Sequence, residues 1–480
     1  MSNILTCELL VIGGGPAGLA AATQAAALGA SVLLLDEQPA PGGQIYRGIT
    51  STPVTNKQIL GSDYWHGATL VDAFRASGTS YQPRSTVWAI QPLGRGERGF
   101  EVAYSKDHVS NIIHARHVLL ANGAQERPFP IPGWTLPGVI TAGAAQILLK
   151  SAGVVPDERT LLAGCGPLLY LIAWQYLNAG VKVAALLDTT PRGRMLQALP
   201  YAWDFMRSAY LAKGLRLLRT VRASIPIVSN VTHLEARGSS KLERVRYVVG
   251  GRSWEVAADQ LLLHQGVVPN LNLSQAAGVP NRWNARLRCW EPKVDEWGAT
   301  VVPALSIAGD GAGIAGALAA EHRGRISALQ AAFELGRIDK QTRDQLARAP
   351  QKAYARAIRG REFFDTLYQP ADVFRAPVGD TIVCRCEEVT ARQVREVVAQ
   401  GCRGPNQLKA FLRCGMGPCQ GRFCGLTVGE LIASESHQTP QTVGHYRLRF
   451  PTKPMTLGEL ASLPQTDASR AAVIRFKRPS

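Results

Sequence analysis

The feature that most constrains this fold is a turn of closely spaced glycines near the N-terminus. Residues 9–18 read Leu-Leu-Val-Ile-Gly-Gly-Gly-Pro-Ala-Gly. An alanine-rich stretch follows up to Gly29, and a second apolar run over 32–35 ends in Asp36. Strand, glycine turn, helix, strand and terminal acid form the order of a dinucleotide-binding βαβ unit. The pattern therefore predicts an α/β protein with a nucleotide at the helix N-terminus.

Each residue type in this turn has a separate physical task. Gly13 permits the tight turn, Gly15 lets the backbone approach a pyrophosphate, and Gly18 allows the helix to pack closely on the strand. Pro16 suits the first helical turn, where its missing N–H costs nothing. Asp36 is spaced to accept a hydrogen bond from a ribose hydroxyl. The predicted cofactor-binding residues of this unit are Gly13, Gly15, Pro16, Ala17, Gly18, Asp36 and its neighbour Glu37.

A second unit of the same kind begins at residue 160. Residues 160–169 read Thr-Leu-Leu-Ala-Gly-Cys-Gly-Pro-Leu-Leu, and a later apolar run ends in Asp188. Leu169 stands where the third glycine belongs, which pushes the helix away from the strand and weakens the pyrophosphate seat. Asp188 favours a ribose diol, whereas Arg192 and Arg194 favour a phosphate. NAD(P), another adenine nucleotide and a vestigial fold all stay open for this unit.

Cysteines gather in one short segment near the C-terminus. Six of the nine lie between residues 384 and 424. Apart from Cys402, they form a pattern of Cys384-x-Cys386 followed by Cys414, Cys419 and Cys424. The intervening sequence predicts a helix over 391–399. Thiolates spaced in this way hold a metal or a cluster. A neighbouring flavin or nicotinamide fold favours an iron–sulfur cluster, and structural zinc stays the alternative.

Composition and charge indicate which kinds of partner this chain can bind, and they say less about its fold. A chain of 480 residues predicts several domains, and its net charge of +17 comes from dispersed Lys and Arg. Dispersed charge argues against nucleic acid and favours an acidic protein partner or anionic lipid. No apolar run reaches the ~20 residues of a membrane span. The N-terminal apolar run leads straight into the glycine turn and is no signal peptide, so we expect a cytoplasmic protein with reduced thiols.

Acid–base chemistry has no clear residues in this sequence. No Cys-x-x-Cys occurs, which excludes the dithiol–disulfide exchange of such a motif. His264 at a predicted strand end and His322 on a predicted helix are the available bases, but neither has a recognisable partner constellation. The catalytic residues are therefore unknown from the sequence.

Three further segments resemble motifs of two-dinucleotide flavoproteins of the glutathione and thioredoxin reductase kind. Residues 305–311, Leu-Ser-Ile-Ala-Gly-Asp-Gly, are similar to the Gly-Asp motif whose acid binds the ribityl and pyrophosphate region of FAD. Residues 121–124 resemble the Ala-Thr-Gly strand end, with Asn122 in place of Thr, and residues 42–44 resemble the flavin-contacting loop. The resemblance implies FAD in the first fold. It adds Gly43, Gln44, Ala121, Asn122, Gly123, Gly309 and Asp310 to the cofactor-binding residues.

The cysteine segment resembles the [2Fe-2S] domain of bacterioferritin-associated ferredoxin. That domain pairs Cys-x-Cys with a second cysteine pair after an Ala-Gly-x-Gly stretch, which residues 414–417 match. The resemblance implies that the ligands are Cys384, Cys386, Cys419 and Cys424. This chain has Cys-x-x-x-x-Cys where the family usually has Cys-x-x-Cys, which leaves Cys414 as a substitute for Cys424.

Together these patterns divide the chain into five parts. They are a discontinuous FAD domain (1–125 and 290–345), an inserted second dinucleotide domain (126–289), a basic and irregular connector (346–378), the [2Fe-2S] domain (379–430) and a proline-containing extended strap (431–480). The predicted fold class is thus a two-dinucleotide-domain α/β flavoprotein with a small cysteine-rich C-terminal domain.

In this order the chain resembles the larger subunit of opine oxidases, of dye-linked proline and hydroxyproline dehydrogenases and of hydrogen cyanide synthase. The shared segments include Gly-Trp-Thr-Leu-Pro-Gly-Val at 133–139 and Cys-x-Cys-Glu-Glu-Val-Thr at 384–390. The resemblance implies a flavin-dependent oxidoreductase subunit for CH–NH or CH–NH2 donors. A glycine-oxidase-like flavoprotein β subunit would oxidise the C–N bond, and in several members FMN lies at the subunit boundary.

The resemblance therefore predicts an electron-transfer subunit, and it allows a small third ferredoxin-like subunit. The first alternative is a self-sufficient NAD(P)H-dependent flavin reductase that feeds a ferredoxin-like acceptor. The second alternative is a non-enzymatic assembly scaffold with relic folds.

Overall fold

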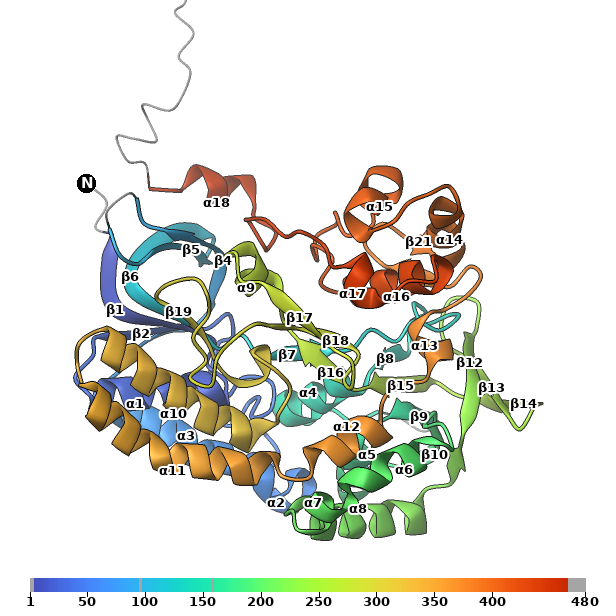
Figure 1. The fold of residues 1–480 in the computed structure, drawn as a ribbon. Helices are drawn as coiled ribbons and strands as arrows, with labels where there is room; N and C mark the ends of the chain where they lie inside the picture. Colours follow the sequence, from blue (N-terminus) through green and yellow to red (C-terminus); the bar gives the residue numbers. More distant parts are fainter. Residues whose placement is uncertain (1–3, 95–96, 157–158, 465–480) are drawn as a thin grey trace, which may run out of the picture.

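The first domain is built on a seven-stranded sheet. The computed structural model describes residues 4–94, 97–156 and 159–464 (Figure 1). The sheet has the order β3-β2-β1-β6-β5-β4, and β19 pairs with β6. Its strands are β1 (Leu5–Ile12), β2 (Val32–Leu35), β3 (Ser80–Gln82), β4 (Ser85–Pro92), β5 (Phe100–Lys106), β6 (Val109–Leu120) and β19 (Leu305–Ile307). The parallel pairing of β19 with β6 returns the chain to this sheet after a long insertion.

Helices cover one face of this sheet. They are α1 (Pro16–Ala27), α3 (Ser62–Ala76) and α10 (Ala317–Glu334), and α11 (Lys340–Ile358) packs on α10 (Figure 1). Helices α1 and α10 approach so closely that a Cβ on Gly324 would lie 2.1 Å from the Ala17 carbonyl oxygen. The predicted order of strand, helix and strand over residues 9–36 is confirmed by β1, α1 and β2.

The inserted domain has a five-stranded parallel sheet of order β11-β10-β9-β15-β8. Its strands are β8 (Val139–Thr141), β9 (Thr160–Cys165), β10 (Val183–Asp188), β11 (Ile227–Ser229) and β15 (Gln260–Gln265), flanked by α4 (Ala142–Ala152), α5 (Pro167–Asn178) and α8 (Tyr210–Ser224). A smaller antiparallel sheet contains β12 (Val231–Arg237), β13 (Arg244–Val249) and β14 (Arg252–Ala257). The outgoing β7 (Ala124–Glu126) pairs with the returning β16 (Val267–Pro269), so the two crossings between domains lie side by side.

The expectation of an irregular connector over 346–378 is wrong, because most of this segment is helical. Helix α11 continues to Ile358 and is followed by α12 (Arg361–Leu367) and α13 (Asp372–Arg375). Asp339 caps α11 by accepting from the Thr342 amide at 2.7 Å. The Lys, Arg, Gln and Ala of this stretch are good helix formers, and only a narrow stripe including Ala347 is buried. A weak hydrophobic period therefore reflects a mostly solvated helix.

The cysteine-rich domain packs around its own small core. It contains β20 (Ile382–Cys384), β21 (Val389–Thr390), α14 (Ala391–Ala399), α15 (Pro405–Leu412) and α16 (Gly425–Glu435). The predicted helix over 391–399 is confirmed as α14, which Thr390 and Gln393 start with reciprocal capping bonds. Buried ion pairs dock this domain, because Glu430 on α16 accepts from Arg375 at 2.5 Å and from Arg288 at 2.8 Å.

The C-terminal segment runs from the cysteine-rich domain back to the first sheet. It carries α17 (Pro440–Val443) and α18 (Leu457–Ala461), which lie at opposite ends of this path (Figure 1). The Thr452 amide donates to the Trp88 carbonyl at 3.0 Å, and Lys453 pairs with Glu37 at 2.6 Å. The predicted strap (431–480) overlaps α16, which continues to Glu435, and its residues 465–480 lie outside the described residues. The name strap is used below for residues 440–463.

Candidate cofactor sites

The first glycine turn is shaped by close backbone contacts. Gly13 has φ +111°, and a Cβ there would lie 2.4 Å from the Ala121 carbonyl oxygen. A Cβ on Gly18 would lie 1.8 Å from the Gly13 carbonyl oxygen. Gly15 differs, because its Cβ would meet only Gly43 Cα, at an ordinary 3.7 Å. Gly13 and Gly18 are therefore required by the protein itself, whereas Gly15 leaves open space in front of α1.

Asp36 lies buried at the end of β2 with donors around it. Its two carboxylate oxygens accept from the amides of Gly14 and Gln38, each at 3.0 Å. Burial raises the pKa of Asp36 to about 6 against the opposing effect of those two hydrogen bonds and of Arg47. Within the described residues, the buried Arg47 Nε and Tyr81 hydroxyl have no hydrogen-bonding partner. A buried acid beside unpaired donors fits the ribose and phosphate end of a dinucleotide.

Two of the later flavin motifs converge on the same turn. Asp310, in the 3-10 turn η2 (Gly309–Gly311), accepts from the amides of Ala315 and Gly316 at 2.9 and 3.0 Å, just before α10 begins. Asn122 donates to the Asn270 carbonyl at 2.9 Å, while its own Oδ1 is buried without a partner among the described residues. An orphaned acceptor at this place suits a ligand donor.

The predicted residues of the first fold are placed unevenly. Gly43 packs on the turn, since a Cβ there would lie 2.7 Å from Gly15 Cα. Gln44 is exposed, and Glu37 is held by Lys453 of the strap. Arg47 was missed by sequence reasoning, because nothing in its context separates it from the other arginines. The roles of Gln44 and Glu37 stay predictions.

At the second glycine turn, Asp188 and Cys165 form hydrogen bonds with other residues of this chain. Asp188 accepts from the Tyr170 hydroxyl at 2.6 Å and from the Thr190 amide at 2.8 Å. The Cys165 thiol, between the two turn glycines, donates to the Tyr368 carbonyl at 3.4 Å, just beyond α12. Leu169 is fully buried in the place of the third glycine. Both carboxylate oxygens of Asp188 are therefore engaged, and Tyr368 lies against the turn.

His264 has a partner that its sequence context did not reveal. Its Nδ1 lies 2.7 Å from Glu126 Oε1, and the other oxygen of Glu126 accepts from the Gly143 amide at 2.9 Å. The imidazole is buried next to Gly166. The Nδ1 of His322 is buried without a partner among the described residues, and burial lowers the pKa of this imidazole. The structure thus groups His264 with Glu126 and leaves His322 outside any described polar network.

The five clustered cysteines form a group of three and a pair in the small domain. The Sγ atoms of Cys384, Cys414 and Cys424 lie within 4.8 Å of one another, and all three residues are buried. Hydrogen bonds from the other two thiols are the main reason that the pKa of Cys384 falls to about 2. The exposed Cys386 is in hydrogen-bonding contact with Cys419, which is half-buried. Three buried sulfurs and an adjacent pair at the rim supply more than the four thiolates that a [2Fe-2S] centre needs.

The cysteine loop, residues 413–425, is held next to the first domain by a hydrogen bond. Gln125 Nε2 donates to the Arg422 carbonyl at 2.7 Å. Gln125 lies on β7, three positions after the predicted FAD-binding residue Asn122. The loop that carries Cys419 and Cys424 therefore packs against the strand that directly follows this part of the predicted FAD site. This contact places the two candidate cofactor sites on neighbouring parts of the molecule.

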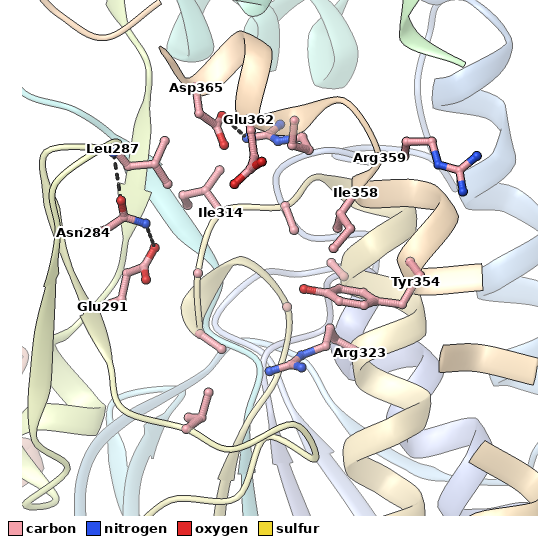
Figure 2. Close-up of a pocket in the computed structure, with 18 of the residues that line it drawn as sticks. Asn284, Leu287, Glu291, Ile314, Arg323, Tyr354, Ile358, Arg359, Glu362 and Asp365 are labelled. Atoms are coloured by element: carbon pink, nitrogen blue, oxygen red, sulfur yellow. Dashed lines mark hydrogen bonds and ion pairs between the residues drawn. The ribbon is translucent and has the colours of Figure 1, made fainter. Parts of the chain in front are cut away.

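A polar cavity of about 670 Å³ opens beside η2 (Figure 2). Its walls come from the β17–β18 hairpin (Asn281–Asn284 and Cys289–Pro292), from α10 and α11, and from α12. Glu291 accepts from Asn284 at 2.8 Å, and Arg361 pairs with Asp365 at 3.0 Å on the opposite wall. The cavity shares Gly309 with the flavin motif, but Gly13, Gly15 and Asp36 do not line it. The cavity therefore adjoins the Gly-Asp motif, while the glycine turn itself does not line it.

Comparison with known proteins supports both sites. Residues 7–336 match the pyridine nucleotide-disulphide oxidoreductase family, and residues 382–434 match the BFD-like [2Fe-2S] binding domain. An opine oxidase subunit of Rhizobium meliloti is 47% identical over 97% of this chain and 89% of that protein. Hydrogen cyanide synthase subunit HcnB of Pseudomonas aeruginosa is 31% identical over 95% of this chain and 98% of that protein.

Among solved structures, L-proline dehydrogenase from P. horikoshii has the same fold. Its TM-score is 0.68 at 19% identity, over 96% of this chain and 81% of that chain. T. acidophilum thioredoxin reductase matches 68% of this chain and 97% of that chain at a TM-score of 0.51 and 20% identity. Within the described residues, every helix is too short or too polar to cross a bilayer.

The family matches and the fit of the residues agree on the cofactors. The first fold binds FAD, and the cysteine-rich domain binds a [2Fe-2S] cluster. The predicted fold class and family resemblance are confirmed. The chain belongs to the pyridine nucleotide-disulphide oxidoreductase family, as a flavin-dependent oxidoreductase subunit of the group that includes subunits of opine oxidase and hydrogen cyanide synthase and that carries a BFD-like [2Fe-2S] domain.

Proposed function

We propose that this chain is the electron-transfer subunit of a heteromeric cytoplasmic dehydrogenase or oxidase of amino acids or opines. A glycine-oxidase-like flavoprotein β subunit would oxidise the substrate C–N bond, and a small third ferredoxin-like subunit would complete some assemblies. Relatives named as subunits of opine oxidase, hydrogen cyanide synthase and sarcosine oxidase support a multi-subunit complex. The substrate class, hydroxyproline, proline, opine or glycine, belongs to the partner.

The observation that carries this proposal is the contact between two segments that adjoin the predicted cofactor sites. The Gln125–Arg422 bond holds the cysteine loop against the strand that follows Asn122. Flavins exchange one or two electrons and [2Fe-2S] centres exchange one, so neighbouring sites of the two kinds suit a relay. In this chain, Gly15 would admit the pyrophosphate at the turn that Gly13 shapes, Asp36 would bind the ribose and Asp310 the ribityl region.

The cluster ligands that we propose are Cys384, Cys386, Cys419 and Cys424, with Cys414 as the substitute for Cys424. Cys384 and Cys424 belong to the buried triad, and Cys386 and Cys419 form the rim pair. Cys424 also stands at the N-cap of α16, where contacts with the Cys384 and Cys414 thiols, together with burial, raise the pKa of its own thiol. Cys414 is equally buried and lies 3.9 Å from Cys424, so it keeps its place as a substitute.

The alternative of an NAD(P)H-dependent reductase is disfavoured by the second turn. Asp188 already accepts two hydrogen bonds, Leu169 fills the glycine position, and Tyr368 lies against Cys165. We therefore expect NADH and NADPH to leave the flavin of the purified chain oxidised in an anaerobic absorbance assay. Rapid bleaching of the flavin by either nucleotide would restore the alternative.

The proposed function is tested in the complex with its partner subunit. Iron and labile sulfide should each be present at two per chain, and substrate should produce the electron paramagnetic resonance signal of a reduced cluster. Replacing Cys384 with Ser should slow electron transfer to the acceptor more than reduction of the partner flavin by substrate. Zinc in the cysteine site without sulfide would contradict the proposal, as would equal losses in both steps.

A further inference from the structure

Tyr446, from the strap, is inserted into the cysteine loop. The residue is fully buried and belongs to the same core as Cys384, Cys414 and Cys424. Its hydroxyl lies 4.0 Å from Cys424 Sγ and is also in hydrogen-bonding contact with Cys414. The tyrosine is therefore in contact with sulfurs of the buried triad, although it follows the cysteine domain in the sequence.

The glycines of the loop make room for this ring. A Cβ on Gly415 or Gly421 would lie 2.6 Å from Tyr446 ring atoms, and one on Gly425 would lie 3.1 Å away. Since real Cβ atoms do not approach ring carbons at 2.6 Å, side chains at the first two positions would displace the ring. The loop that carries the predicted ligands is thus built around Tyr446.

The backbone near Tyr446 is fixed from two domains. Gln275, on α9 (Asn272–Ala276), donates to the Tyr446 carbonyl at 2.5 Å. Asn406 on α15 donates to the His445 carbonyl at 3.0 Å and accepts from the Arg447 amide at 2.7 Å. Lys409 lies over the Tyr446 ring, 4.8 Å from its centroid. These contacts hold the hydroxyl in place beside the sulfurs.

We propose that Tyr446 is a positioning residue of the [2Fe-2S] site, whose hydroxyl donates a hydrogen bond to a ligand sulfur and raises the cluster's reduction potential. The inference rests on the proposed cluster site. It holds for either choice of fourth ligand, because the hydroxyl contacts both Cys414 and Cys424. Reduction adds one electron to an already anionic thiolate-bound centre, and a donated hydrogen bond stabilises the more negative state.

The test is Tyr446→Phe, which keeps the ring that fills the glycine-lined space and removes only the hydroxyl. Iron and sulfide content should be unchanged. The cluster midpoint potential should fall by the equivalent of about tenfold in the one-electron equilibrium, or about 59 mV. The iron–thiolate stretching bands should also shift in the resonance Raman spectrum. Tyr210→Phe is the matched control, because it removes a hydroxyl bond to the Ala357 carbonyl outside the cysteine domain and should change neither readout.

A second variant separates the ring from the hydroxyl. Tyr446→Leu should lose most of the cluster while the flavin content stays unchanged, because the smaller side chain leaves a cavity where the ring packs inside the loop. A full cluster with unchanged potential and Raman bands in Tyr446→Phe would overturn the inference and leave the proposed function intact. Loss of the cluster from Tyr446→Phe itself would also overturn the inference, since the hydroxyl would then be needed to retain the cluster and not to set its reduction potential. Zinc without sulfide in the unsubstituted chain would instead defeat the proposed function.

Discussion

At the scale of single residues, the first turn separates glycines that shape the fold from the glycine that leaves room for a cofactor. A Cβ atom on Gly13 or Gly18 would collide with a backbone carbonyl oxygen, so a side chain at either position would disrupt the turn. These two roles follow from the sequence motif alone. The Arg47 and Tyr446 sites do not, because each depends on a fold that brings distant segments together.

Gly15→Val should abolish FAD retention without unfolding the first domain. The Gly15 Cβ position has only one ordinary protein contact, so the added side chain would enter the space that the pyrophosphate needs. Released FAD after denaturation and apoprotein thermal unfolding measure the two effects. Gly193→Val is the control, since Gly193 has nothing within 4 Å of its Cβ position, and it should keep its FAD. A full complement of FAD in Gly15→Val would show that the first fold is assigned wrongly.

Asp36 should make FAD binding dependent on pH. Because burial raises the pKa of Asp36 to about 6, the folded apoprotein retains a proton between pH 4 and 6 that the unfolded chain releases. This group's contribution to apoprotein stability therefore falls as the pH rises through that window. Ribose hydroxyls donate to the ionised carboxylate, so FAD affinity should instead increase with pH, by up to about tenfold per unit below pH 6.

Flavin fluorescence titration between pH 5 and 7.5 checks this expectation. Asp36→Asn should bind FAD more weakly and lose the pH dependence. Glu435→Gln should keep that dependence, because Glu435 lies on α16 of the cysteine-rich domain and pairs with Arg395 there. The same pH slope in Asp36→Asn as in the unsubstituted chain would refute the role of this carboxyl group.

At the scale of helices and strands, the sequence was most informative where local signals agree. Strand β1, helix α1 and strand β2 combine apolar runs, a proline at the helix start and glycines at the turn, and α14 begins with a capping pair. Helix α11 was missed because its surface is mostly solvated and offers little hydrophobic period. Patterning reports burial, so a helix that buries little leaves a weak trace.

We expect Glu430 on helix α16 to stabilise the packing of the cysteine-rich domain against the rest of the chain. Glu430→Ala would leave the buried Arg375 and the partly buried Arg288 without their shared carboxylate, which should cost about 3–5 kcal/mol. Glu435→Ala on the same helix breaks a more exposed pair with Arg395 and should cost at most about 1 kcal/mol. The free energy of unfolding, followed by denaturant titration, measures both. Similar losses in the two variants would contradict the docking role.

At the scale of the whole molecule, the order of the parts could be predicted but their contacts could not. The motifs indicate two dinucleotide folds followed by a cysteine cluster, and the parallel return of β19 to β6 accounts for the interrupted first sheet. No sequence signal indicates that Gln125 meets Arg422, that Tyr368 closes the second turn or that the strap fills the cysteine loop. Such contacts depend on long-range packing, which single-sequence patterns do not encode.

The most direct test of the relay compares substrate turnover by the isolated chain with turnover by the assembled complex. The isolated chain should not oxidise proline, hydroxyproline, sarcosine or opines with an artificial dye, although it holds FAD and the cluster. Co-expression with a glycine-oxidase-like subunit should yield a complex that co-purifies and turns over its substrate. Turnover by this polypeptide without a partner, at the rate of the complex, would contradict the account by placing the active site on this chain.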